Sequence, residues 1–174
     1  NKDFELYQDI SNQVSNAYVK VLTDGKGKLY NEFQTGYVLP LYFKMFKDEE
    51  QRKNAVNNLV KLIEKNSYCI GTGFPGTPYI LFALTDNGRE DVAMKMLLNT
   101  SCPSWLYEVK TGGTTIWERW DSYTKEKGLQ EAIMNSFNHY SLGSCSEWFY
   151  EYVLGISPLE AGFKKVRIRP FVDR

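Results

Sequence analysis

The sequence of 174 residues holds few of the residues that bind metals or form disulfides. It has one histidine, His139, and three cysteines, Cys69, Cys102 and Cys145, which lie far apart and form no CxxC pair. A zinc site is therefore not expected, and no ligand spacing implies another metal or a cofactor. Because three cysteines cannot form a closed set of disulfides, we expect buried or half-buried thiols in a reducing compartment, which favours the cytoplasm.

Net charge and long hydrophobic runs are also lacking. The 21 Lys and Arg residues balance the 21 Asp and Glu residues, so binding to a phosphate backbone is not expected. The longest apolar run has six residues, Tyr79 to Leu84, whereas a bilayer span needs roughly 18. The start, NKDFELYQDI, lacks the basic and apolar regions of a signal peptide, although a leader on a longer parent would not be visible. We expect neither nucleic acid nor a membrane as partner.

What the sequence does contain is a series of helical patterns, with enough aromatic residues (15%) to exclude a disordered chain. Amphipathic patterns cover residues 4–22, 48–66 and 89–98, and apolar helices are expected over residues 31–46, 77–84 and 133–154. Pro40 should kink the first apolar helix. Residues 99–127 are expected to form a long loop, which holds three of the four tryptophans, and residues 164–171 alternate as a strand does.

The alternation of amphipathic and apolar helices favours two nested layers of helices joined as hairpins, which is an α/α toroid. The alternatives are an ordinary helical bundle or a solenoid, but no fixed repeat of 34 or 40 residues is visible. Six expected helices are about half of what a six-hairpin toroid needs. The predicted fold class is therefore all-α, with half of an (α/α)6 toroid followed by a short β-strand.

The segment most suited to chemistry is residues 114–121, TTIWERWD. Glu118 stands between Trp117 and Trp120, and Asp121 follows three residues later. Indole rings stack on the C–H face of sugars, and glycoside hydrolysis requires two carboxyl groups. The pattern therefore indicates a carbohydrate site, although a packed aromatic corner with a surface ion pair between Glu118 and Arg119 explains it equally well.

A second group of polar residues opens the last apolar helix, at Asn135, Ser136, Asn138 and His139. Polar groups in a buried helix are costly unless they find partners or a ligand. They are therefore candidates for binding hydroxyl groups in a central cavity. The alternative for His139 is a core histidine that is satisfied by a backbone carbonyl.

Several blocks occur together in one order: residues 72–79 (TGFPGTPY), 84–88 (LTDNG), 103–107 (PSWLY), 114–121 (TTIWERWD) and 134–140 (MNSFNHY). This set resembles the C-terminal half of the catalytic domain of bacterial α-L-rhamnosidases, glycoside hydrolase family 78. Residues 165–170, KVRIRP, resemble the first strand of the β-domain that follows that barrel. The resemblance covers roughly residues 34–170. It implies a partial (α/α)6 catalytic barrel over residues 1–162, and the start of a β-domain over residues 163–174.

The resemblance also implies a reaction, the hydrolysis of terminal α-L-rhamnosides with inversion. Glu118 matches the general base of the family's T-x-W-E block and would activate the attacking water. His139 matches a rhamnose-contacting histidine, and Trp117, Trp120, Asp121 and Asn138 are weaker candidates for the pocket wall. The implied partner is a rhamnose-containing glycoside or oligosaccharide.

One part of the family pattern is missing from these residues. The family's general acid is a glutamate in an Asp/Arg-rich block ending W-x-G-D, and no such block occurs in the 174 residues. We therefore expect an isolated fragment to be inactive and to associate with itself through exposed apolar helix faces. Two other functions remain as alternatives: a non-catalytic helical carbohydrate-binding or interaction module, and another toroid glycosidase or lyase.

Overall fold

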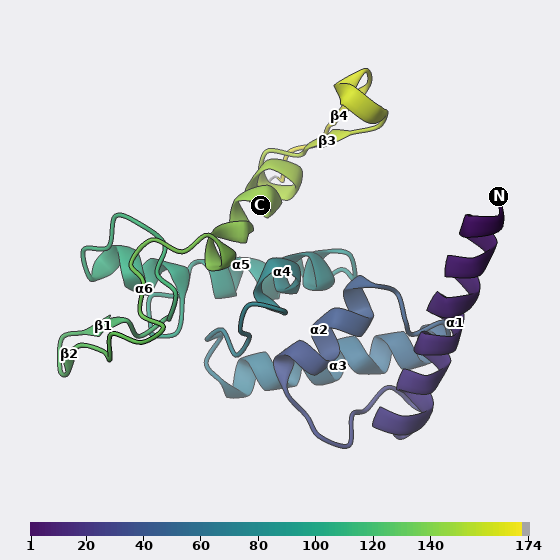
Figure 1. Ribbon diagram of the computed structural model, residues 1–174, viewed down its shortest axis with the longest axis horizontal. Helices are drawn as coiled ribbons and strands as arrows, with labels where there is room; N and C mark the ends of the chain where they lie inside the picture. Colours follow the sequence, from purple (N-terminus) through teal and green to yellow (C-terminus); the bar gives the residue numbers. More distant parts are fainter. Residues whose placement is uncertain (172–174) are drawn as a thin grey trace.

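The computed structural model describes residues 1–171, in which helices predominate and the strands are short (Figure 1). In chain order the helices are α1 (Lys2–Leu22), α2 (Gln34–Tyr42), α3 (Glu49–Lys65), α4 (Thr77–Thr85), α5 (Glu90–Leu97), α6 (Trp105–Lys110), the 3-10 helix η1 (Ser141–Ser144), α7 (Cys145–Trp148), the π-helix η2 (Phe149–Val153) and the 3-10 helix η3 (Ala161–Phe163). The strands are β1 (Tyr123–Thr124), β2 (Gly128–Leu129), β3 (Ile156–Pro158) and β4 (Val166–Ile168).

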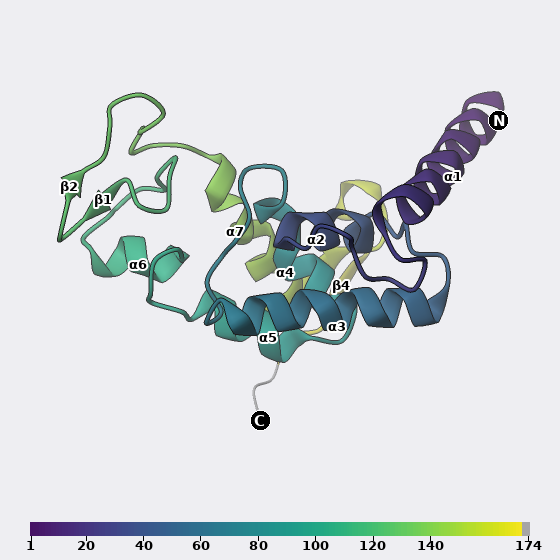
Figure 2. The same cartoon turned by 90° about the horizontal axis from the view of Figure 1, so that it is seen from below.

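The centre of the molecule is a set of apolar helices covered by amphipathic ones. Helix α2 packs against α3 and α4, and α4 packs in turn against α5, η1 and α7. Helix α4 is buried along almost its whole length, whereas α3 buries one stripe: Ala55, Val56, Leu59, Val60 and Ile63. Figure 2 shows α3 and α5 along one side of α2 and α4. The expected alternation of inner and outer helices is confirmed.

Helix α2 is shorter than expected, because the helix predicted over residues 31–46 is limited to Gln34–Tyr42. Pro40 lies inside it and has no N–H to donate to the carbonyl of Gly36. The hydroxyl of Tyr18 in α1 donates to that carbonyl instead, at 2.6 Å. Beyond the helix, Lys44 has a φ of 55°, which a helix does not accommodate.

Helix α1 confirms the predicted amphipathic helix but is largely uncovered. Its apolar side chains include Phe4 (67% exposed), Tyr7 (68%) and Val21 (64%), and Ser15 is its one buried residue. Figure 1 shows α1 projecting from one end of the helical body. Its amphipathic pattern was enough to predict a helix, but within residues 1–171 its apolar face is covered only near its end, where Tyr18 and Val19 pack against the core.

Two expectations for the second half of the chain are wrong. The loop expected over residues 99–127 contains α6, and the long helix expected over residues 133–154 is helical only from Ser141 to Val153. Residues 135–139 are not helical because their backbone groups bind a distant segment: Ser136 O accepts from Glu118 N at 2.8 Å, and His139 N donates to Ile116 O at 2.9 Å. These bonds replace the ones that a helix would use.

The last two described strands, β3 and β4, form a small hairpin that projects from the body (Figure 1). Strand β4 confirms the expected C-terminal strand, and it pairs antiparallel with β3, with Ile156 opposite Ile168. The predicted domain boundary between residues 162 and 163 stays a prediction. Strand β3 precedes this boundary in the sequence, and its partner β4 follows it. Among residues 1–171, no helix combines the length and the hydrophobicity that spanning a membrane requires.

Candidate active site

The two segments singled out for chemistry lie side by side. The backbone bonds from Glu118 to Ser136 and from His139 to Ile116 join residues 116–118 to residues 136–139. The hydroxyl of Thr115 also donates to the carbonyl of Phe137. Glu118 and His139, which are 21 positions apart in the sequence, therefore belong to adjoining pieces of chain.

Glu118 is half-buried and is held at one of its two carboxylate oxygens. Oε2 accepts the N–H of Ser136 at 2.8 Å, so the side chain is directed toward Ser136. No other hydrogen bond and no ion pair to this carboxylate occurs within residues 1–171. One oxygen thus fixes the side chain, while the other can accept a proton from a water molecule.

His139 is half-buried and stacks with two aromatic rings. Its ring centroid lies 4.8 Å from that of Phe74, with a 7° angle between planes, and 5.3 Å from that of Tyr140, with an angle of 8°. Nδ1 accepts the N–H of Ser141 at 3.3 Å. The neutral ring therefore carries its proton on Nε2, which is available as a donor. The backbone partner of this histidine is an N–H, whereas the core-histidine alternative expected a carbonyl.

Trp120 and Asp121 are both fixed by neighbours. The Trp120 ring packs edge-to-face on Trp105 at 5.6 Å, and its Nε1 donates to Thr72 O at 3.4 Å. Arg119 donates to both oxygens of Asp121, from Nε to Oδ1 at 3.2 Å and from Nη2 to Oδ2 at 3.4 Å. The ion pair of this block is thus formed by Arg119 and Asp121, whereas the alternative reading paired Arg119 with Glu118.

The remaining two predicted site residues differ in exposure. The Trp117 side chain is 3% exposed and packs against Phe137, with ring centroids 5.3 Å apart. Asn138 is exposed, and its backbone N–H donates to the Ser136 hydroxyl at 3.2 Å. Trp117 therefore anchors the block from within, whereas Asn138 lies on its surface.

Sequence reasoning missed Glu108, a buried carboxyl group next to this block. Glu108 lies in α6, is 2% exposed, and accepts the N–H of Trp117 through Oε2 at 3.3 Å. Burial raises its pKa to about 7, although the Trp117 N–H acts in the opposite direction. No pattern in the sequence marked this residue, because α6 itself was expected to be part of a loop.

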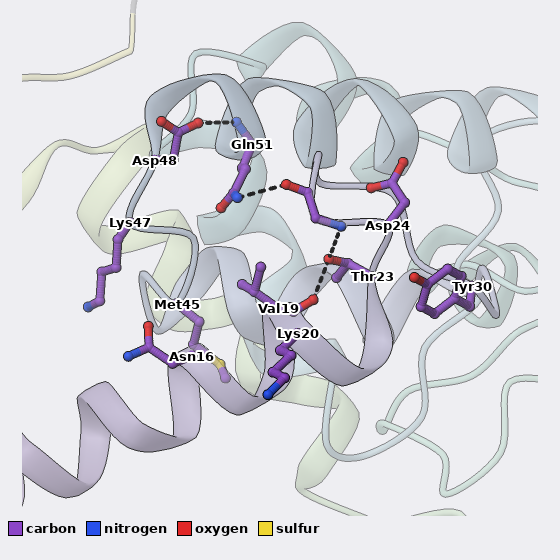
Figure 3. Close-up of a pocket in the computed structure, with 11 residues that line it drawn as sticks. Asn16, Val19, Lys20, Thr23, Asp24, Tyr30, Met45, Lys47, Asp48 and Gln51 are labelled. Atoms are coloured by element: carbon purple, nitrogen blue, oxygen red, sulfur yellow. Dashed lines mark hydrogen bonds between the residues drawn. The ribbon is translucent and has the colours of Figure 1, made fainter.

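A separate cavity of about 460 Å³ lies at the other end of the molecule, between α1, the turn that follows it and the start of α3 (Figure 3). Its polar groups already bind one another: Gln51 Nε2 donates to Gly25 O at 2.8 Å, and Gly25 N donates to the Thr23 hydroxyl at 3.0 Å. Asp48 caps α3 by accepting the N–H of Gln51 at 2.8 Å. This cavity is a junction between elements and contains none of the predicted site residues.

Comparison with known families gives a match to the model of the bacterial alpha-L-rhamnosidase six-hairpin glycosidase domain over residues 1–153. An alpha-L-rhamnosidase of Streptomyces avermitilis is 43% identical over 169 residues, and one of Formosa agariphila is 41% identical over 165 residues. The alignments cover 97% and 95% of this chain but 16% and 17% of those proteins. The chain therefore spans about a sixth of their length.

Solved structures give the same relationship. The native alpha-L-rhamnosidase of Aspergillus terreus superposes with a TM-score of 0.91 at 39% identity, covering 97% of this chain and 20% of that one. The Streptomyces avermitilis alpha-L-rhamnosidase complexed with L-rhamnose gives a TM-score of 0.91 at 40% identity, covering 97% of this chain and 16% of that one. The all-α architecture described above is therefore that of a fragment of a six-hairpin toroid.

Proposed function

Because this chain belongs to the family of bacterial α-L-rhamnosidase six-hairpin glycosidase domains, we propose that it supplies the general base of an inverting α-L-rhamnosidase. The substrate would be a terminal α-L-rhamnoside in a glycoside or oligosaccharide. The observation that carries this proposal is the anchoring of Glu118, whose Oε2 takes the Ser136 N–H. Its other oxygen is left to face a water molecule beside the segment that carries His139.

In the proposed reaction, Glu118 removes a proton from water as the water oxygen bonds to the anomeric carbon. The bond from that carbon to the leaving oxygen breaks on the opposite face, and a general acid gives that oxygen a proton. Inversion requires the two carboxyl groups to be about 6.5–9.5 Å apart, so that water fits between them. None of the 174 residues forms the acid's W-x-G-D block, so we place the acid outside this chain.

The other residues would hold the sugar. His139 can donate from Nε2 to a sugar hydroxyl, because its Nδ1 is occupied by the Ser141 N–H. We propose that the half-buried Trp120 ring lies against the sugar, and that Asp121 and Asn138 bind hydroxyl groups at the pocket wall. Trp117 would support the wall from behind, since its side chain is buried.

Without the acid, this chain alone should turn over slowly or not at all, because acid–base assistance contributes typically about 10²–10⁴-fold. We further propose that the isolated chain associates with itself. The exposed apolar side chains of α1, among them Phe4 and Tyr7, support this, since large apolar faces rarely remain free in water. Light scattering should give dimers or larger species, and a clean monomer with a cooperative melt would contradict self-association.

The test of the base is Glu118→Gln in the full-length gene product. Hydrolysis of an aryl α-L-rhamnoside should fall by at least two orders of magnitude, in line with loss of a positioned base, while rhamnose binding is retained. The matched control is Glu126→Gln, which alters an exposed carboxylate and should leave the rate unchanged. An unaltered rate in Glu118→Gln would eliminate the assigned role.

A panel of aryl glycosides separates the remaining possibilities. Release from an α-L-rhamnoside alone supports the proposal, and preferential release from another sugar would redirect it to a different toroid glycosidase. Binding of rhamnose with no hydrolysis in the full-length gene product would favour a carbohydrate-binding module. The product's configuration, read by NMR at early times, tests inversion directly.

A further inference from the structure

A buried carboxyl group touches the peptide that leads into Glu118. Glu108 Oε2 accepts the N–H of Trp117 at 3.3 Å, and Trp117 directly precedes Glu118 in the chain. The second oxygen, Oε1, is also buried, and it has no hydrogen-bond partner in the part of the chain that the structure describes. Because these residues already exclude solvent from Oε1, a partner outside them has no open path to it.

The charge on Glu108 is equally unpartnered. No Lys, Arg or His side chain among residues 1–171 forms an ion pair with it. The charge of Glu108 acts on the thiols of Cys102 and Cys145, but burial raises the pKa of each to about 11, so both are neutral near pH 7. A buried carboxylate without a cation is unfavourable, which favours the protonated group near neutrality.

The surroundings of Trp117 make its position depend on this contact. The carbonyl of Glu108 accepts the N–H of Gly113 at 2.8 Å, which folds the chain back toward Trp117. A Cβ at Gly113 would lie 3.0 Å from the Trp117 ring, so that side is fully packed. Phe137 packs against the same ring. A shift of the Trp117 peptide would therefore be transmitted to Glu118 rather than absorbed by free space.

We propose that Glu108 is a positioning residue for Glu118: by accepting the Trp117 N–H, its carboxyl group fixes the peptide that carries the proposed base. This inference rests on the role proposed for Glu118. The neutral form of Glu108 is compatible with its buried surroundings. The carboxylate is more stable when it is hydrated, which requires water to enter or the backbone to move at this contact. As Glu108 loses its proton, Glu118 should therefore be held less firmly in its orientation, and kcat should fall.

Two substitutions in the full-length gene product separate this role from simple packing. Glu108→Met keeps the shape and removes the acceptor, so kcat should fall about tenfold or more, since small misplacements of catalytic groups are costly, while KM changes less than twofold. Glu108→Gln keeps an acceptor for the Trp117 N–H and cannot ionise. It should hold kcat within threefold at pH 6. Between pH 6 and pH 8 its kcat should decline less than that of the unaltered protein, because only the part due to the general acid remains.

Two results would overturn the inference: an unchanged kcat in Glu108→Met, or a decline with pH in Glu108→Gln that is as steep as that of the unaltered protein. The control is Glu126→Met, an exposed carboxylate, which should behave as the unaltered protein. Loss of hydrolysis in Glu118→Gln with no effect of Glu108→Met rejects the positioning role alone. Full hydrolysis in Glu118→Gln rejects the proposed base, and the measurement below still tests the contact.

Hydrogen exchange tests the contact in the unaltered protein, so it does not depend on how well a variant folds. After correction for the intrinsic rate at each pH, the peptide over residues 113–120 should lose protection between pH 6 and pH 8. The control peptide over residues 55–63 in α3 should not. Equal protection of residues 113–120 at both pH values would contradict a contact that depends on the Glu108 proton.

Discussion

Helices α3 and α6 both face the core, but they bury different kinds of side chain. Each begins with a polar cap: Asp48 for α3, and Ser104, whose hydroxyl accepts the Tyr107 N–H at 3.1 Å, for α6. Helix α3 has 17 residues and buries apolar side chains only, whereas α6 has six residues and buries Trp105 together with Glu108. The apolar helix supports the fold, and the short helix with a buried acid borders the candidate site.

The largest expected effect is a loss of stability when a buried apolar side chain of α3 is removed. Leu59 has no exposed surface, so Leu59→Ala leaves a cavity and should lower the free energy of unfolding by roughly 2–5 kcal/mol. Urea unfolding followed by circular dichroism measures this. Leu98→Ala, at a leucine that is 61% exposed, is the control and should change the free energy little. Equal losses for the two variants would contradict the assignment of the core.

The next effect concerns α6 and depends on pH. The pKa of Glu108 rises from 4.5 to about 7 on folding, so the folded protein binds the proton more tightly. Its contribution is fully present below pH 4.5 and is lost as the pH rises through about 7, a change of roughly 3 kcal/mol. Unfolding free energies of Glu108→Gln should lack this decline between pH 5 and pH 8, and those of Glu126→Gln should retain it.

A smaller effect is expected at the start of α6. Ser104→Ala removes the acceptor for the Tyr107 N–H and should cost about 1 kcal/mol of stability. Thermal unfolding measures the loss, and Ser104→Asp, which restores a capping side chain, should recover part of it. A Ser104→Ala melt that matches the unaltered protein would show that α6 does not depend on its cap.

The smallest effect on stability is expected in α1, which resembles α3 in pattern but not in burial. Val14 is 54% exposed, so Val14→Ser should change the free energy of unfolding by less than about 0.5 kcal/mol. The same substitution should reduce self-association in light scattering if the α1 face forms the contact. A large loss of stability would mean that this face is covered in the isolated chain.

Helices with a regular apolar period could be predicted from the sequence, whereas the arrangement of the candidate site residues could be predicted only in part. The stripe of α3 and the apolar run of α4 were placed within one or two residues, because burial of one face imposes the period directly. Residues 133–140 were assigned to a helix in error, since nothing in their own sequence indicated the backbone bonds to residues 116–118. Glu118 and His139 were identified as candidates from residue type and family resemblance.

The sequence by itself determined the alternation of helices, the absence of a charge excess and the family to which the chain belongs, because these follow from residue type and local spacing. Only the tertiary structure decided that Glu118 and His139 lie on adjoining segments and that Arg119 pairs with Asp121. It also placed an acid, Glu108, inside the protein next to the site. Apart from the Arg119–Asp121 pair, whose members are two positions apart, these contacts join different segments of the chain. The energies of all of them depend on burial and geometry, which local patterns do not specify.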